Sequence, residues 1–177
     1  MNQLEVLRES LGQCDEIILD ALLMRNRIVE DIMAYKEAND IPILQPEQEA
    51  KQKEWLERRM ADRRHKVEVE DVFGSITQNS KRIQARKLFN YNIVLIGFMG
   101  AGKSTISDFL KTVFAMDVVE MDQIIAERQG MSISDIFETY GEEYFRELET
   151  KLLVEMQSRS NVVISCGGGT PMRECNV

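Results

Sequence analysis

Residues 92–105 read Asn-Ile-Val-Leu-Ile-Gly-Phe-Met-Gly-Ala-Gly-Lys-Ser-Thr, an apolar run that leads directly into a glycine-rich segment. The spacing G-x-x-x-x-G-K-[ST] is met by Gly97, Gly102, Lys103 and Ser104. In such a segment backbone N–H groups close around phosphate oxygens, the lysine reaches the outer phosphates, and the serine hydroxyl binds Mg²⁺. A helix that begins near Lys103 would add the positive end of its dipole. A glycine-rich turn without a ligand is the alternative, and the flanking strand and helix patterns disfavour it.

The composition is that of a folded globular protein. The chain has 177 residues, of which 44% are hydrophobic, and this size is typical of one or two domains. It contains no apolar run of about eighteen residues, and its N-terminus lacks the layout of a secretory signal. We therefore expect a cytoplasmic protein with no membrane partner.

Charge and cysteine content argue against two further classes. The net charge is −8, and acidic residues outnumber basic ones in both halves of the chain. We therefore expect no nucleic-acid partner, and the one basic cluster, within residues 58–64, alternates with acids as a solvated helix face does. The three cysteines and the single histidine show no metal-ligand spacing. This pattern indicates reduced thiols.

Three helices are predicted before the glycine-rich segment. Apolar residues recur at helical spacing from Leu4 to Lys36, which predicts a helix of about 35 residues. These apolar residues form a stripe along one side of the helix, called the apolar seam here, and a seam of that length needs partner helices to bury it. Ile41-Pro42 ends the helix, because a residue before proline is pushed out of the helical region. Pro46 begins a second helix through Met60, and a third runs from about Val67 to Leu88.

Polar side chains lie on the apolar faces of two of these helices: Arg25, Lys36, Ser80 and Gln84. Burying an unpaired cation costs on the order of a few kcal/mol, so an anionic partner is expected for the basic pair. For any single residue, an internal ion pair with Glu30 or Glu49, or a side chain that reaches the surface, is an alternative. The four together favour a ligand site.

Residues 1–89 resemble the all-helical chorismate mutase family. The resemblance rests on a set of residues that occur in order on the three helices: Leu7, Arg8, Glu9, Asp15, Arg25, Lys36, Glu49, Ser80 and Gln84. It implies the Claisen rearrangement of chorismate to prephenate, without a cofactor. A site for this reaction must hold a dicarboxylate in a compact conformer and stabilise negative charge on the ether oxygen.

The resemblance also implies a role for each basic residue of this set. Arg8 and Arg25 would clamp the two carboxylates of the substrate, while Lys36 and Gln84 would donate to the ether oxygen. Helix geometry places Arg8 about 25 Å from Arg25 and about 42 Å from Lys36, whereas Arg25 and Lys36 are about 16 Å apart. If Arg8 serves the same site, it comes from a second protomer, which predicts a homodimer through the long N-terminal helix, as in the family's interlocked dimer.

The second predicted helix carries one departure from the family. Glu49 and Ser80 would hold the ring hydroxyl and a carboxylate, but Gln48 occupies a substrate-binding position where the family usually has arginine. Losing that cation could weaken binding by about 1–3 kcal/mol. An alternative therefore stays open, in which the helical half is a non-catalytic, dimerising sensor that binds a pathway metabolite and regulates the other half.

Strands alternate with helices after the glycine-rich segment. Residues 117–122 read as a strand that ends in acids, and residues 162–165 as a third buried strand. Between them Ser134 is expected to cap a helix, Gly141 interrupts it, and helical spacing resumes from Glu142 to Gln157. This order predicts an α/β domain with a parallel sheet and ligands at the strand ends.

Residues 92–177 resemble shikimate kinase through the glycine-rich segment, Asp122, Phe145-Arg146 with Glu149, and the triple glycine. Asp122 would bind and deprotonate the acceptor hydroxyl, and Arg146 would pair with the shikimate carboxylate. The remaining implied contacts are ATP on Gly97, Gly100, Gly102, Lys103, Ser104 and Thr105, Mg²⁺ on Ser104 and Glu120, and the substrate ring on Gly167, Gly168 and Gly169. An ion pair between Arg146 and Glu149, three residues apart, is the alternative for that arginine, and another small-molecule kinase is the alternative for the family.

The second half is short for such a kinase. A five-stranded kinase with a lid needs about 160 residues, and the family's lid arginine and last substrate arginine have no counterpart here. The missing neighbouring strand would leave residues 93–96 as an exposed apolar edge. We therefore expect a bifunctional shikimate-pathway enzyme, with domains at residues 1–89 and 92–177, whose kinase half is truncated and inactive.

Overall fold

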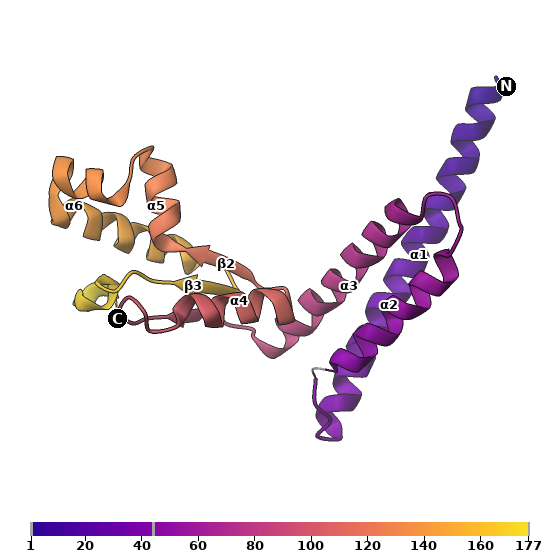
Figure 1. The fold of residues 1–177 in the computed structure, drawn as a ribbon, viewed down its shortest axis with the longest axis horizontal. Coiled ribbons are helices and arrows are strands. Elements are labelled where there is room, and N and C mark those ends of the chain that lie inside the picture. The colour runs from indigo at the N-terminus through magenta and orange to yellow at the C-terminus, as the bar shows by residue number, and fades with distance from the viewer. Residues whose placement is uncertain (1, 44, 177) are drawn as a thin grey trace. The chain divides into compact units, whose positions relative to one another are not determined.

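A computed structural model describes residues 2–43 and 45–176 of the chain. It contains two compact units, Met1–Gln84 and Ala85–Val177. The first unit is helical and the second combines helices with a small sheet (Figure 1). Among residues 2–43 and 45–176, every helix is too short or too polar to span a membrane.

The first unit consists of the three predicted helices, α1 (Gln3–Ala38), α2 (Pro46–Met60) and α3 (Lys66–Leu88), and α3 continues a few residues into the second unit. Asn2 begins α1 with a capping box, in which its side chain accepts from the Leu4 N–H and Glu5 Oε2 accepts from the Asn2 N–H. Pro46 begins α2, where its missing N–H needs no partner. The predicted pattern of three helices is therefore confirmed.

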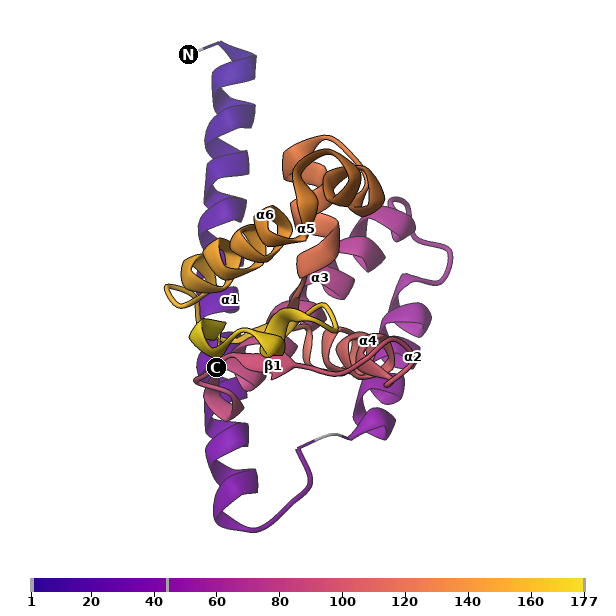
Figure 2. The same cartoon turned by 90° about the vertical axis from the view of Figure 1, so that its left-hand side faces the viewer.

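Most of the apolar seam of α1 is not covered within the unit. Val29 and Met33 are buried, but Leu7, Leu11 and Ile17 expose 60%, 62% and 70% of their surface. The N-terminal turns of α1 extend beyond α2 and α3 (Figure 2). An apolar stripe of this length is unfavourable in water and needs a partner surface.

The second unit is built on a parallel sheet with the order β1-β3-β2, formed by β1 (Ile93–Leu95), β2 (Asp117–Glu120) and β3 (Val162–Ser165). Three helices connect the strands, namely α4 (Lys103–Phe114), α5 (Met121–Gln129) and α6 (Ile133–Met156). The chain ends in two short 3-10 helices, η1 (Thr170–Met172) and η2 (Glu174–Asn176). The predicted parallel α/β fold is confirmed.

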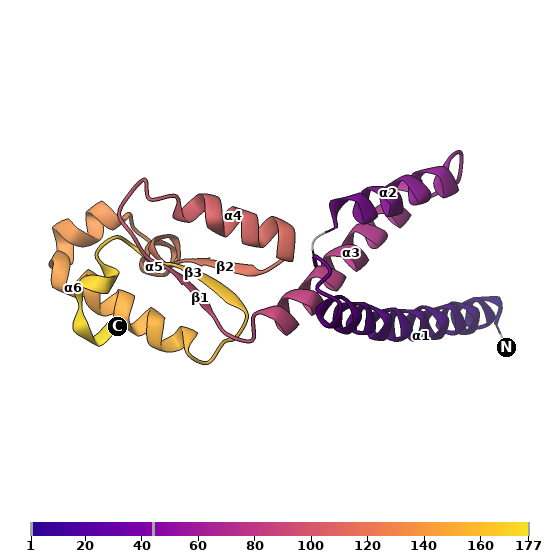
Figure 3. The same cartoon turned by 90° about the horizontal axis from the view of Figure 1, so that it is seen from below.

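Side chains of the central strand alternate between the two faces of the sheet. Val163 packs with Leu110 of α4, whereas Ile164 packs with Leu152 and Met156 of α6. Figure 3 shows α4 on one face of the sheet and α6 on the other. All four residues of β3 are buried, so this strand is the core of the unit.

Strand β1 lies at an edge of the sheet. It pairs only with β3 among the described strands, and Val94 and the following Ile96 expose 49% and 61% of their surface. The expected apolar edge at residues 93–96 is therefore present. Such an edge leaves backbone N–H and C=O groups available to another strand.

The N-terminus of α6 differs from the prediction. Ser132 caps this helix, and the predicted cap, Ser134, lies inside its first turn. Asp135 decides between the two serines, because its backbone N–H donates to Ser132 Oγ while its carboxylate accepts from the Ser132 N–H. The predicted interruption at Gly141 is confirmed, with a φ of 83°. The strand predicted over residues 117–122 ends at Glu120, because α5, which apolar spacing did not reveal, begins at Met121 and includes Asp122.

Candidate active sites

Arg25 of α1 and Ser80 of α3 are in contact in the helical unit. The Arg25 guanidinium donates to Ser80 Oγ, and the same hydroxyl donates to the Ile76 carbonyl at 3.0 Å. Ser80 is buried, and burial lowers the pKa of Arg25. In the described part of the chain no carboxylate forms a salt bridge with Arg25. A half-buried cation held by a neutral hydroxyl can bind an anion.

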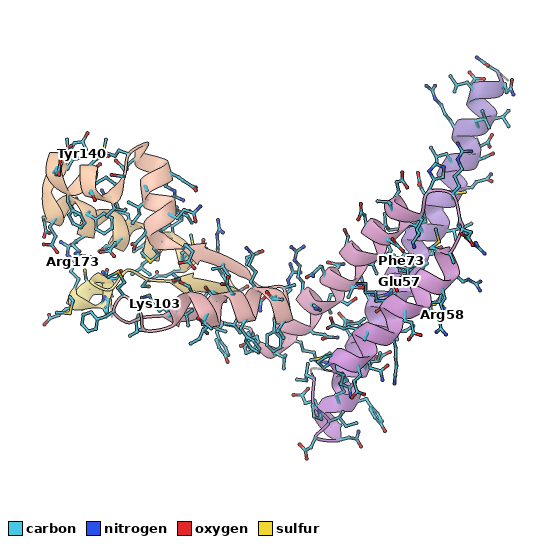
Figure 4. All side chains as sticks on the ribbon, viewed as in Figure 1. Glu57, Arg58, Phe73, Lys103, Tyr140 and Arg173 are labelled. Atoms are coloured by element: carbon cyan, nitrogen blue, oxygen red, sulfur yellow. The ribbon has the colours of Figure 1, made fainter. Side chains whose placement is uncertain are left out.

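Glu49 of α2 meets α3 at a second contact. Its Oε2 lies 2.8 Å from Lys81 Nζ, and the Lys81 side chain is only 16% exposed. The two residues line a cavity of about 430 Å³ between α2 and α3, whose walls also include Glu57 and Phe73 (Figure 4). Of the predicted mutase residues, only Glu49 lines this cavity.

The other predicted mutase residues lie apart from these contacts. Lys36 Nζ donates to the Ile43 carbonyl at 2.9 Å, and Gln84 is half-buried one turn beyond Ser80. Gln48 and Arg8 are exposed. One chain therefore brings together α1 with α3 and α2 with α3, but it does not gather all of the predicted residues around one cavity.

The glycine-rich segment of the second unit folds as a closed loop. Gly97, Gly100 and Gly102 have φ values of 143°, 83° and 85°, a region that favours glycine. Lys103 Nζ donates to the carbonyls of Gly97 at 2.7 Å and of Phe98 at 3.2 Å, which fastens the two ends of the loop (Figure 4). Lys103 is also the first residue of α4.

The start of α4 fits a phosphate chain. Gly102 caps the helix without a side-chain hydrogen bond, and Ser104 and Thr105 are exposed in its first turn. The first N–H groups of a helix have no partner inside it, and they carry the positive end of the dipole. These donors, together with the Lys103 ammonium group, suit the phosphates of a nucleotide.

Acidic residues gather at the carboxyl ends of β2 and β3. Glu120 Oε1 accepts from Ser107 Oγ at 3.2 Å. A Cβ on Gly167 would lie 2.9 Å from Asp122 Oδ1 and 3.0 Å from Glu149 Oε1, so only glycine fits without a shift between these carboxylates. Partial burial, followed by the negative charge of Glu149, raises the pKa of Asp122. Asp122 therefore takes up a proton more readily than an isolated aspartate, as a base in a proton transfer must.

Among the described residues, these acids do not form a complete set of metal ligands. The structure shows no group of three or more His, Cys, Asp or Glu side chains arranged to hold a metal ion in the ranges 2–43 and 45–176. A Mg²⁺ ion commonly keeps several waters and is bound by one or two protein groups plus substrate phosphates. Glu120 and Ser104 are compatible with that mode, in which phosphate oxygens supply the other ligands.

Arg146 forms ion pairs within its own helix. Its Nη1 lies 2.7 Å from Glu149 Oε2 and its Nη2 lies 2.9 Å from Glu142 Oε1. The pairing with Glu149 that the sequence left open is therefore present. The guanidinium also lies directly against Gly169, where an added Cβ would collide with it. Arg146 and the triple glycine thus form adjoining parts of one surface.

Residues that the sequence analysis did not single out hold this surface in place. Thr170 Oγ1 donates to Glu149 Oε1. Asn176 Nδ2 donates to the Thr170 carbonyl at 2.8 Å, while its Oδ1 accepts from Thr150 Oγ1, also at 2.8 Å. Only the position of Thr170 directly after the triple glycine pointed to it. Buried Cys166 lies in the same region, and burial, followed by the charges of Glu149 and Asp122, raises its pKa to about 11.

One ion pair and one aromatic contact lie at the surface of α6. Arg173 pairs with Glu143, and the rings of Tyr140 and Tyr144 lie 4.8 Å apart. Figure 4 marks Arg173 and Tyr140 on this side of the unit. The ion pair between Arg173 and Glu143 joins α6 to the segment after the triple glycine, whereas both tyrosines belong to α6 itself.

Comparisons with known proteins match the two halves separately. Residues 7–85 match the family model "Chorismate mutase type II" and residues 99–177 match the family model "Shikimate kinase". The chain is 48% identical over 86 residues to a shikimate kinase of Dehalococcoides mccartyi, covering 49% of each protein. It is 49% identical over 78 residues to a shikimate kinase of a Sulfurihydrogenibium species, covering 44% of this chain and 47% of that one.

A solved structure of shikimate kinase from Acinetobacter baumannii in complex with shikimate is 38% identical, with a TM-score of 0.47 over 49% of this chain and 48% of that one. The chain spans about half the length of the curated relatives it matches. All of these relatives align with its second half. The chain therefore joins a segment that matches the chorismate mutase type II family model, residues 7–85, to a segment that matches the shikimate kinase family model, residues 99–177.

Proposed function

We propose that the helical half of this chain catalyses the rearrangement of chorismate to prephenate and that the second half binds ATP and shikimate as part of a shikimate kinase. The contact of Arg25 with Ser80 is the observation that carries the mutase part, because it presents a half-buried cation that has no carboxylate partner among residues 2–43 and 45–176. A dicarboxylate substrate would supply that partner. The proposal includes a cytoplasmic location.

The mutase step needs a site that positions the substrate and stabilises the negative charge that develops on it. It needs no covalent intermediate. Arg25 would bind one substrate carboxylate. Ser80 Oγ would hold the guanidinium of Arg25 in place by accepting a hydrogen bond from it. Lys36 and Gln84 would donate to the ether oxygen, where negative charge develops as the bond breaks. Donors in a partly desolvated site stabilise that charge more than water does. Glu49 would accept from the ring hydroxyl.

A homodimer is part of this proposal. The exposed seam of α1, which includes Leu7, Leu11 and Ile17, needs a cover, and a second copy of α1 running in the opposite direction offers one. The same arrangement would bring Arg8 of one chain toward Arg25 of the other. Sedimentation of the full chain tests this part, since a monomer at micromolar concentration would contradict it.

The mutase activity is tested directly by following the loss of chorismate absorbance with the full chain. Arg25→Ala should lower kcat/KM by about 10- to 100-fold, because a charged hydrogen bond to the substrate is lost. Arg27→Ala, an exposed change on the same helix, is the matched control and should have no effect. Equal activity of the parent and Arg25→Ala would contradict the assignment.

The kinase half would use its own residues to hold both substrates. Loop N–H groups, Lys103 and Ser104 would bind ATP and its Mg²⁺, which neutralises charge on the transferred phosphoryl group. Asp122 would accept the proton of the attacking hydroxyl, and its raised pKa supports that role. Arg146 would pair with the shikimate carboxylate beside Gly169. Protection of the chain by ATP against thermal unfolding, and its loss in Lys103→Met, tests the nucleotide part.

Gln48 supports a second candidate for the helical half. It is exposed and uncharged at the position where the resemblance implies a cation. A helical half that binds prephenate or chorismate without turnover would be a dimerising sensor that regulates the kinase half. Binding measured by calorimetry in the absence of chorismate loss would favour this candidate.

A further inference from the structure

Lys81 is the most deeply buried ion-paired cation among the described residues of the helical unit. Its side chain is 16% exposed, whereas the other ion pairs of this unit join side chains that are at least 31% exposed. Removing an ammonium group from water is costly, and one partner at 2.8 Å repays that cost only in part. We therefore expect the positive charge of Lys81 to have a function besides the ion pair with Glu49.

Lys81 adjoins the face of α3 that carries the predicted mutase residues. At about 100° per residue, Gln84 lies about 40° from Ser80 and Lys81 lies about 100° from it, on the same side. Gln84 therefore lies between the other two on the helix surface. Ser80 at one border contacts Arg25 of α1, and Lys81 at the other border contacts Glu49 of α2.

Lys81 carries a positive charge next to Glu49, the residue that follows the neutral Gln48. The substrate of the proposed reaction carries two carboxylates, and Gln48 supplies no cation at the start of α2. Lys81 lies against the neighbouring residue, Glu49, and lines the same cavity of about 430 Å³. An ammonium group has three N–H donors, and Glu49 is its one ion-pair partner in the described residues, so donors remain for a ligand.

We propose that Lys81 is a substrate-binding residue of the mutase site and supplies the cation that Gln48 lacks. The proposal rests on the proposed mutase function. Lys81 would donate to a substrate carboxylate from α3 while it holds Glu49 in the orientation needed to accept from the ring hydroxyl. The cation of this site then comes from the third helix, and the second helix contributes the acid.

The test compares variants of the full chain by their KM and kcat for chorismate. Lys81→Met should raise KM about 10- to 100-fold with a smaller change in kcat, because a charged hydrogen bond to the substrate is lost. Lys81→Arg should keep most of the affinity. Gln48→Arg in the Lys81→Met background should lower KM at least halfway back to the parental value on a logarithmic scale, because it returns the cation to α2.

Lys66→Met is the matched control. Lys66 lies on the same helix and also pairs with a glutamate, Glu70, at 3.7 Å, but its side chain is 45% exposed. It should leave KM unchanged. Circular dichroism and the thermal midpoint establish that each variant is folded, and a variant that is not folded is replaced by Lys81→Gln.

Three results would overturn the proposal in an active parent. They are an unchanged KM in folded Lys81→Met, an equal loss in Lys66→Met, or no recovery by Gln48→Arg. If the parent binds prephenate without turnover, the Kd from calorimetry should change as KM would. Lys81→Met should raise the Kd, Lys66→Met should leave it unchanged, and Gln48→Arg should lower it again in the Lys81→Met background. A parent that neither converts chorismate nor binds prephenate would instead contradict the proposed function itself.

Discussion

The carboxylate of Glu149 is completely buried and accepts a hydrogen bond of 2.7 Å from Arg146 Nη1. Its other oxygen accepts from the Thr170 hydroxyl. A buried carboxylate with both oxygens engaged is fixed in place, and it fixes the guanidinium in turn. Glu149 therefore ties α6 to the segment that follows the triple glycine.

Glu149→Gln should lower the free energy of unfolding of the second unit. The amide keeps the size of the side chain but loses the charge that balances Arg146, and its NH₂ group meets a donor where the carboxylate accepted. We expect a loss of about 1–3 kcal/mol in urea denaturation. Glu142→Gln is the control, since Glu142 pairs with the same arginine but its side chain is 71% exposed. That variant should change stability by no more than about 0.5 kcal/mol.

An equal effect of the two substitutions would contradict this account. It would mean that burial of the Glu149 carboxylate contributes nothing beyond a surface ion pair. A larger loss in Glu149→Gln, with no loss in Glu142→Gln, would support a fixed Arg146.

The ionisation of Asp122 should reduce stability as the pH rises. Partial burial and the charge of Glu149 raise the pKa of Asp122 in the folded chain. Its contribution to stability is then fully present below about pH 3.9, the value of an unfolded aspartate, and is lost as the pH rises through the folded value. Asp122→Asn cannot ionise, so it should be more stable than the parent at pH 7 and should lose this advantage toward pH 4.

Urea titrations of both proteins between pH 4 and pH 7 measure this difference. In a Glu149→Gln background the gain from Asp122→Asn should shrink, because one cause of the raised pKa is gone. A stability difference that does not vary with pH would show that Asp122 does not titrate in this window.

Much of the fold could be predicted because its signals are local. Apolar spacing predicted α1, α2 and α3 to within a few residues, and Pro46 marked the start of α2. The cap of α6 was assigned wrongly because Ser132 and Ser134 are equal in local propensity, and the reciprocal bonds with Asp135 decide between them. The short, charged helix α5 lacks a long apolar stripe, so periodicity alone did not reveal it.

The candidate sites were harder to predict because contacts between helices decide them. The glycine-rich segment has a fixed spacing, and its closure by Lys103 agrees with that spacing. Lys81 carries no such signal, since a lysine on a helix most often faces solvent. Only packing of α3 against α2 reveals its contact with Glu49, and only the fold places Thr170 on Glu149.

Arg8→Ala and Lys36→Ala should complement each other when mixed. Each variant is expected to be inactive as a mutase, because each lacks one cation of the proposed site. If Arg8 serves the site of the partner chain, a heterodimer contains one site free of both substitutions. Unfolding the two variants together and refolding them should then recover up to about a quarter of the parental activity at equal amounts, if chains pair at random.

The control is each variant refolded alone, which should stay inactive. Light scattering should establish that dimers form in every sample. Dimers without recovered activity, from variants that are each inactive alone, would show that Arg8 and Lys36 act in the same chain.

A polypeptide of residues 1–177 alone should lack shikimate kinase activity although its phosphate loop is closed and well formed. Val94 and Ile96 are exposed at the β1 edge, and the kinase relatives are about twice as long as the matched segment. The resemblance implies a lid arginine that has no counterpart in residues 92–177. Loss of such an arginine costs about 10³-fold or more in related phosphoryl transfers.

The measurement is release of ADP that depends on both ATP and shikimate, with Lys103→Met as the background control. We expect a rate at least about 10³-fold below the 1–100 per second of ordinary kinases. Binding of ATP alone should persist weakly, since Lys103 and the start of α4 need no other segment to form their contacts. A rate in the ordinary range that Lys103→Met abolishes would contradict this prediction and would require the missing groups to come from a second copy of the chain.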